Sequence, residues 1–225
     1  MERTSVNTRA LPVFLALACL VPTVFGGYRV AALIWQWDWA LQFSKVHVDN
    51  LPLALHAFFA VTFLLLGAFQ LLPGFRNANF VRHRLIGRLT VVMGLLGAAS
   101  GIVMTLIHTD ISGPLLYAGR ILFGAMWATF LVLAVRAIMA RNIPAHRAWM
   151  MRSYAVALNA GTLAFIYLPI MLVFGEPSPL IDEIIQVAGW IVNLSVAQWF
   201  IRRGTKRRAK LLPGPARNPQ PRAPA

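Results

Sequence analysis

The segment HRLIGRLTVVMGLLGAASGIVMTLIH, residues 83–108, decides the fold of this chain. Its interior, 85–107, has Arg88 as its one charged residue and is longer than the roughly 20 residues that a helix needs to cross about 30 Å of hydrocarbon. Glycines recur within it, and a histidine stands at each end. The segment therefore predicts a transmembrane helix with histidines near both membrane surfaces.

The rest of the chain has the same apolar character. Of its 225 residues, 58% are hydrophobic and 12% are charged, about half the charged share that is usual in soluble domains. A soluble globule of this composition would expose extensive apolar surface. The composition therefore excludes a soluble enzyme and a disordered protein. The single cysteine, Cys19, excludes a disulfide framework and covalent c-type haem attachment.

Hydropathy along the chain predicts an all-α membrane protein with six transmembrane helices. They cover about 10–30, 53–72, 85–107, 119–139, 153–174 and 184–201. The second to fifth spans are expected to form the core bundle, because their connections are short and rich in turn residues. The predicted division of the chain is a cytoplasmic N-terminus at 1–9, one transmembrane domain at 10–202, and a basic, Pro-rich, disordered cytoplasmic tail at 203–225.

The formal charge of +14 is distributed very unevenly between the two sides of these spans. One set of alternate loops and termini holds 18 of the 21 Lys and Arg residues against one acidic residue, Glu2. The other set holds Arg29, Lys45 and Arg120 against six acidic residues. Because positive residues collect on the cytoplasmic side of membrane proteins, both termini are predicted to be cytoplasmic. The charge thus reports topology, and we predict no nucleic-acid partner.

Four histidines lie near the ends of the predicted spans, with His56 and His108 on the outer side and His83 and His146 on the inner side. Two imidazoles at equal depth on separate helices are what bis-histidine ligation of a b-type haem requires. Arginines near the inner pair are of the type that binds haem propionates. These are Arg84, Arg88, Arg147 and Arg152. The sequence therefore predicts His83 and His146 as haem-iron ligands, with His56 and His108 as a second pair.

A simpler interpretation of the same histidines stays open. His83 and His108 are 25 residues apart, about 37 Å along a helix, so both reach headgroup level and need no ligand there. Between them, Gly87, Gly94 and Gly101 keep to one helical face. Such a stripe of small residues permits close helix packing, or leaves space for a flat ligand.

Other chemistry has few candidates in the sequence. Asn159 and Asn193 lie inside predicted spans, where an asparagine is either interhelical glue or a ligand for a transported substrate. No acidic residue occupies the middle of a span, which disfavours a proton-coupled transporter. Hydrolase motifs such as HExxH, GxSxG and the P-loop are absent from the sequence. Whether the protein is an enzyme stays undecided, with a redox role as the candidate.

The strings HRLIGR (83–88) and HRAWMMRSYA (146–155), with the helix that precedes them, resemble the bacterial membrane-protein family named domain of unknown function 2306 (DUF2306). The resemblance covers roughly residues 50–202. It implies a polytopic protein of the bacterial plasma membrane with no assigned reaction. The motif residues that it carries over are His56, Gln70, His83, Arg84, Gly87, Arg88, His146, Arg147, Met150 and Arg152.

A more distant resemblance links His56, Gln70 and His83 to consecutive helices of the two-haem transmembrane cytochrome b proteins. That resemblance implies haem ligation by histidines from alternate helices. His83 with His146 fits the alternation. His56 with His108 departs from it, because the fourth span contains no histidine.

Three functions follow from these observations. The best specific one is a b-type haem module that moves electrons between a quinone or cytoplasmic donor and an acceptor. The alternative is a non-catalytic membrane assembly or scaffold protein that binds anionic lipid through its His-Arg loops. The third is a small-molecule transporter that uses the two intramembrane asparagines.

Overall fold

The computed structural model describes residues 50–71, 79–109 and 112–211, with a few isolated positions between 19 and 35. Regular structure in this part of the chain is all helical. The helices are α3 (Asn50–Leu71), α5 (Phe80–Ile107), α6 (Pro114–Met139), α7 (Ile143–Ala157), α8 (Asn159–Phe174) and α9 (Pro179–Leu211). The all-α prediction is therefore confirmed for the described residues. The predicted first span and the end of the tail, 212–225, lie outside them.

Four of the described helices are long and apolar enough to cross a membrane, namely α3, α5, α6 and α9. The helices α7 and α8 meet at Leu158 with a bend of 42° and together make a possible fifth crossing. Five of the six predicted spans thus have a helical counterpart, and the six-span prediction is confirmed only in part. The helix α9 also continues to Leu211, so residues 203–211, predicted as disordered tail, are helical.

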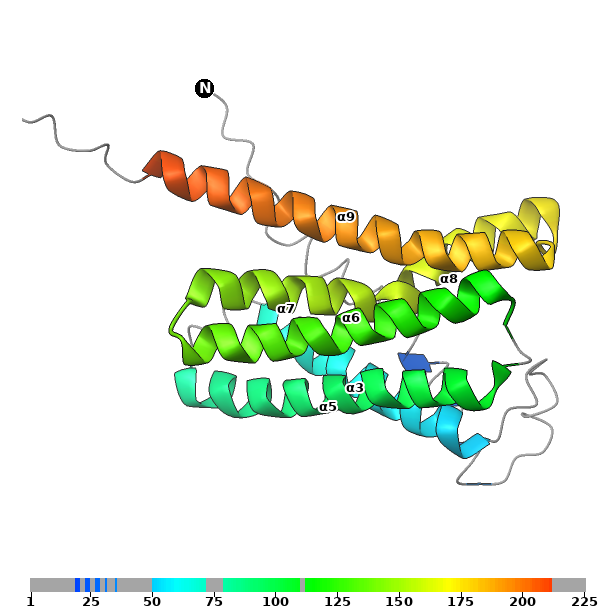
Figure 1. Ribbon diagram of the computed structural model, residues 1–225, viewed down its shortest axis with the longest axis horizontal. Helices are drawn as coiled ribbons and strands as arrows, with labels where there is room; N and C mark the ends of the chain where they lie inside the picture. The colour runs from blue at the N-terminus through cyan, green and yellow to red at the C-terminus, as the bar shows by residue number, and fades with distance from the viewer. Residues whose placement is uncertain are drawn as a thin grey trace, which may run out of the picture.

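The helices α5, α6 and α7 alternate in direction, α8 continues α7 past the bend, and α9 runs back (Figure 1). The charged residues therefore collect at the two ends of the bundle. We call one end the basic end. It holds the start of α5, the α6–α7 turn and the C-terminal part of α9, with Arg82, Arg84, Arg88, Arg136, Arg141, Arg147, Arg202 and Arg203. The opposite, acidic end holds Glu176, Asp182 and Glu183, together with Arg120. The side-by-side arrangement of the spans thus agrees with the predicted charge asymmetry.

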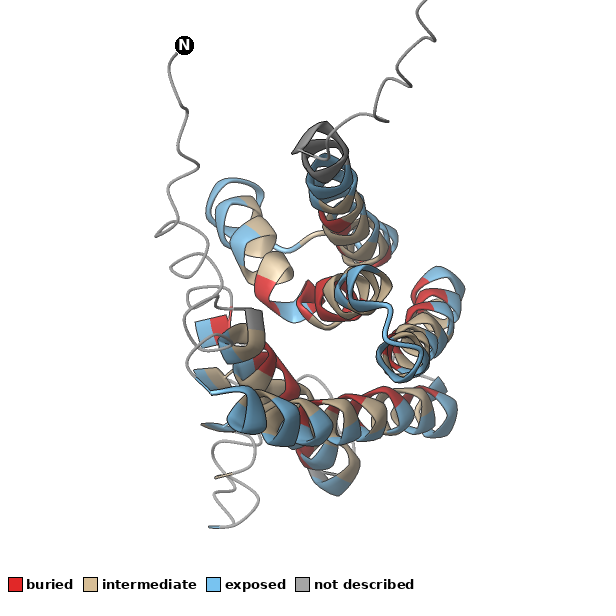
Figure 2. Cartoon of the chain, turned by 90° about the vertical axis from the view of Figure 1, so that its left-hand side faces the viewer, coloured by how far each residue is buried: buried red, intermediate tan, exposed pale blue. Residues whose placement is uncertain are grey.

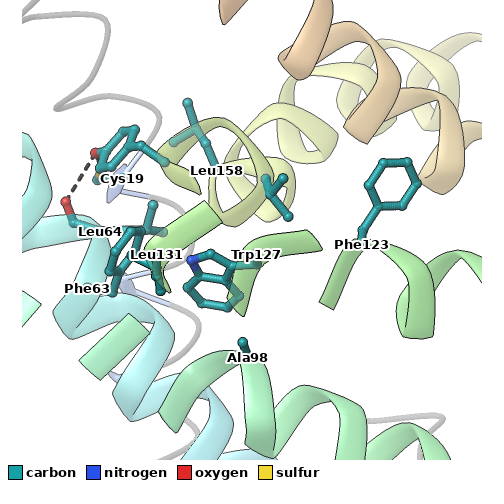
Figure 3. Packing of buried hydrophobic residues seen from close by; sticks show 10 residues of the cluster. Cys19, Phe63, Leu64, Ala98, Phe123, Trp127, Leu131 and Leu158 are labelled. Carbon is teal, nitrogen blue, oxygen red and sulfur yellow. Dashed lines mark hydrogen bonds between the residues drawn. The ribbon is translucent and has the colours of Figure 1, made fainter. Parts of the chain in front are cut away.

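The helices α3, α5, α6 and α7 enclose the core. The predicted core of spans two to five is confirmed only in part, because most of the fifth span, 153–174, is α8, which packs mainly on α9. Phe63 and Trp127 meet edge to face with ring centroids 5.2 Å apart, beside the fully buried Leu131. The buried Tyr154 hydroxyl donates to the Leu64 carbonyl at 3.1 Å, which links α7 to α3 (Figure 3). Figure 2 shows the buried residues facing inward, and the outward faces are rich in exposed apolar side chains such as Leu172 and Phe174. Outward apolar faces of this kind suit a lipid environment.

The glycine stripe of α5 is used mainly for close helix packing. A Cβ on Gly94 would lie 2.7 Å from both the Phe63 and Leu131 side chains. One on Gly97 would lie 2.8 Å from the Trp127 ring, and one on Gly101 would lie 2.9 Å from the His56 ring. The space over these three glycines is therefore filled by protein. Gly87 differs, because the nearest atom to its Cβ position is a Gln70 oxygen at 4.0 Å.

Alanine variants are expected to distinguish the closely packed Gly94 from the loosely packed Gly87. Gly94→Ala should lose about 1–3 kcal/mol of unfolding free energy, because two buried side chains must move. Gly87→Ala should be neutral or gain up to about 1 kcal/mol from its higher helix propensity. Denaturant unfolding of both variants in the same detergent measures the difference. Equal stability of the two variants would contradict the packing role of Gly94.

Candidate functional site

The two inner histidines begin their helices in the same way. The Asn79 side chain caps α5 by accepting from two backbone N–H groups, and the Asn142 side chain caps α7 by accepting from one. Each histidine follows its cap by four residues, and its N–H donates to the cap's carbonyl, at 3.1 Å for His83 and 3.0 Å for His146. Both imidazoles therefore leave the first turn of a helix at the basic end of the bundle.

The structure also brings His83 and His146 to nearly the same level. Tyr154 of α7 and Thr90 of α5 both approach Gly67 of α3, at 2.8 and 4.0 Å from its Cβ position. His83 precedes Thr90 by seven residues and His146 precedes Tyr154 by eight, or about 10 and 12 Å of helix. Because α5 and α7 each pack on α3 and α6, they occupy opposite corners of the four-helix core.

One of these rings has a fixed tautomer. The His146 Nδ1 atom lies 2.9 Å from the Ala134 carbonyl oxygen of α6, and a carbonyl can only accept. Nδ1 therefore donates, and the lone pair of the neutral ring lies on Nε2, the atom that most often ligates a metal. Gly87, whose Cβ position lies 4.0 Å from the Gln70 side-chain oxygen, is one turn along from His83. This end of the core can thus present the lone pair of the His146 imidazole.

The outer pair is arranged differently. The His56 ring packs directly on α5, where Nδ1 donates to the Gly97 carbonyl at 3.0 Å and also lies 3.3 Å from the Ser100 hydroxyl. His108 closes α5 seven residues beyond Gly101, about 10 Å farther along the axis. The structure does not bring His56 and His108 to one level, and protein atoms fill the space that a ligand between His56 and α5 would need.

The four predicted arginines separate into two groups. Arg84, Arg88 and Arg147 are exposed at the basic end, and the Arg84 guanidinium lies over the Phe80 ring at 4.6 Å. Arg152 is partly buried and turns toward α9. Its Nε and Nη2 atoms donate to the Gln198 side-chain oxygen at 3.2 and 2.8 Å.

Residues 53–201 match a protein-family model described as "Predicted membrane protein (DUF2306)". The chain belongs to this family. The match confirms the family resemblance and the membrane assignment, and it spans all four histidines of the predicted pairs. No curated protein and no solved structure matches the chain significantly. The likeness to two-haem cytochromes therefore stays a prediction.

A metal site built from protein ligands alone has no counterpart in the described part of this DUF2306 protein. Within residues 50–71, 79–109 and 112–211, and the few described positions before them, no group of three or more His, Cys, Asp or Glu side chains comes together. A porphyrin brings its own four nitrogen ligands, so a haem needs only two axial histidines from the chain. The paired histidines would meet that need.

A carboxylate network at the acidic end was missed by the sequence analysis. Glu183 is 8% exposed, and its Oε2 atom accepts from the Leu116 N–H at 3.0 Å, at the start of α6. Asp182 accepts from the Tyr167 hydroxyl and from the Gln186 amide. The last span was predicted to begin at 184, so Asp182 and Glu183 were expected in a loop. The signal that identifies them as helical is Pro179 followed by acidic residues in the first turn.

The two intramembrane asparagines connect α8 to α9. The Asn193 side-chain oxygen accepts from the Thr162 hydroxyl at 2.9 Å, and the Asn159 amide donates to the Gln186 carbonyl at 3.3 Å. Asn159 also lies at the α7–α8 bend, directly against Gly189 of α9. These contacts favour interhelical glue over the substrate-ligand interpretation.

Removing the Glu183 carboxylate should destabilise the start of α6. Its N-cap, Gly113, has no capping side chain, so Glu183 supplies the cap from another helix. Glu183→Ala is expected to lose about 1–2 kcal/mol of unfolding free energy. The buried Leu116 N–H would lose its acceptor, and the positive end of the α6 dipole would lose the nearby carboxylate. The exposed Glu176 offers a control, whose alanine variant should change by less than about 0.5 kcal/mol. Denaturant unfolding in detergent measures both, and matching losses would contradict the cap.

Proposed function

We propose that this DUF2306 protein is a b-type haem protein of the bacterial inner membrane. One haem would lie between α5 and α7 at the basic end, with His83 and His146 as its axial ligands. The observation that carries the proposal is the equivalent placement of the two histidines. Each stands four residues after an asparagine cap, on opposite helices of the core and at nearly the same level. This geometry suits ligation from both faces of a porphyrin.

The surroundings of the pair support the same assignment. The Ala134 carbonyl orients the His146 ring and leaves Nε2 free to ligate. Gly87, at the inner end of the stripe, is less closely packed than Gly94, Gly97 and Gly101, because the nearest atom to its Cβ position is a Gln70 oxygen at 4.0 Å. The exposed Arg84, Arg88 and Arg147 can bind propionates at the membrane surface.

A bound haem would supply reversible one-electron transfer. The chain's own part is to hold the iron through two imidazoles, to keep the His146 tautomer fixed and to neutralise the propionates. We infer that the electron partners are a quinone in the bilayer and a cytoplasmic donor, because the pair lies near the basic membrane surface. A second haem between His56 and His108 is not part of the proposal, since the two are about 10 Å apart along the helix axis.

The proposed orientation, with the basic end in the cytoplasm, follows from the charge asymmetry. Single cysteines at Ala140 in the α6–α7 turn and at Ser178 before α9 probe the two ends, in a Cys19→Ser background. Ser178→Cys should react with a membrane-impermeant maleimide in intact cells, and Ala140→Cys only after permeabilisation. The reverse pattern would contradict the orientation.

The haem proposal predicts a coloured protein whose spectrum depends on two histidines. Protein purified in detergent should show α- and Soret bands after dithionite reduction. Loss of a residue that merely orients a ligand lowers metal affinity about 10–100-fold, so His83→Ala and His146→Ala should each lose at least that much haem affinity. The measurement is the haem-to-protein ratio by pyridine haemochrome assay.

The outer histidines are the matched controls. His56→Ala and His108→Ala should keep the wild-type haem content, and size-exclusion profiles show whether each variant is folded. A folded wild-type protein that stays colourless, even after haem reconstitution, would overturn the proposal in favour of a non-catalytic scaffold. If His108→Ala lost haem while His83→Ala and His146→Ala kept it, the assignment of His83 and His146 as the ligands would be contradicted.

A further inference from the structure

A groove of about 720 Å³ runs between α6 and α9 on the outside of the core. Its volume lies within the range of small-molecule sites. The proposed haem ligands do not line it, so it is independent of the haem proposal. The groove is divided along its length into an apolar part and a cationic mouth.

The apolar part lies toward the middle of the bundle. Phe123 and Met126 of α6 and Ile191 and Leu194 of α9 line it. From Ile191 to Arg202 the groove follows α9 for eleven residues, or about 16 Å. That length is about half of the roughly 30 Å hydrocarbon thickness, which is the depth of one leaflet.

The mouth lies toward the basic end and carries three arginines. Arg152 is held there by two hydrogen bonds to Gln198, with its guanidinium 4.5 Å from the Trp149 ring centroid. Arg203 lies over the Trp199 ring at 3.6 Å, and Arg202 is exposed beside it. Two of the three guanidinium groups are thus pre-oriented by neighbouring side chains, which lowers the entropy cost of binding an anion.

None of the described residues that line the groove is acidic. Three positive charges at the mouth therefore have no carboxylate within the groove to neutralise them. A neutral ligand such as a quinone ring gives these charges no counterion, and a packed helix would have to remove them from water at high cost. A phosphate ester above an acyl chain matches both the charge and the apolar length.

We propose that this groove binds one anionic glycerophospholipid from the leaflet at the basic end. Its phosphate would lie among Arg152, Arg202 and Arg203, with charge-assisted hydrogen bonds from the guanidinium groups. One acyl chain would follow the groove between α6 and α9 toward Phe123. Gln198 is a positioning residue, since it holds Arg152 toward the phosphate.

Native mass spectrometry of the full chain in detergent tests this site with added phosphatidylglycerol, and with phosphatidylcholine of the same chain length as a zwitterionic comparison. Phosphatidylglycerol should remain bound at one per protein. Each arginine near a membrane surface strengthens anionic-lipid binding about fivefold, so Arg152→Gln with Arg202→Gln should weaken it about 25-fold. The charge control is Arg82→Gln at the same end but outside the groove, which should have little effect.

A second pair of variants tests the apolar part without changing charge. Ile191→Trp fills the groove and should weaken phosphatidylglycerol binding at least about fivefold by excluding the chain. Val192→Trp, on the neighbouring exposed position outside the groove, should not. The proposal would be overturned if phosphatidylcholine were retained as well as phosphatidylglycerol, or if Arg82→Gln lost as much lipid as the double arginine variant. Displacement of the lipid by soluble glycerol phosphate would also overturn it.

Discussion

The contact of α5 with α3 and α6 across its glycines sets the geometry of the whole bundle. Helices in lipid gain little from the hydrophobic effect when they associate, so packing at close range holds them together. Phe63, Leu131 and Trp127 occupy the space over Gly94 and Gly97. These contacts fix the axial positions of α3 and α6 relative to α5, and α7 packs in turn on α3 and α6. The level of each polar side chain near the ends of the bundle then depends on how many residues separate it from these packed glycines.

The parts of the fold that depend on the bilayer were predictable from the sequence. The length of an apolar run is set by hydrocarbon thickness, and the predicted span 85–107 lies within α5. The break at Leu158 was not predicted, because no proline marks it and Pro169 lies well beyond it. Asn159 at this bend packs on Gly189, a long-range contact that hydropathy does not report. The helical extension of α9 was missed because hydropathy records where the membrane ends and not where a helix ends.

The site shows the same division between local and long-range information. The levels of His83 and His146 could be compared from the sequence, since each stands near a helix start and helix starts at one surface share a level. His56 was misplaced relative to His108 because its level depends on which turn of α5 its ring meets. The groove mouth was beyond prediction as well. Arg152 and Gln198 are 46 residues apart in the chain, and nothing local to either residue indicates the other.

The two ends of the bundle differ in how their charges are neutralised. At the acidic end, Asp182 and Glu183 are satisfied by groups of the protein itself, including the N–H of Leu116 at the start of α6. Among the described residues, the basic end holds arginines and no carboxylate, because Glu176, Asp182 and Glu183 all lie at the acidic end. Guanidinium groups beside an apolar groove or an apolar core are suited to binding anions from outside the chain. Haem propionates and lipid phosphates are both anions of this kind, and both carry an apolar body that the adjoining helices can hold. The chemistry of this protein is therefore expected at its basic end.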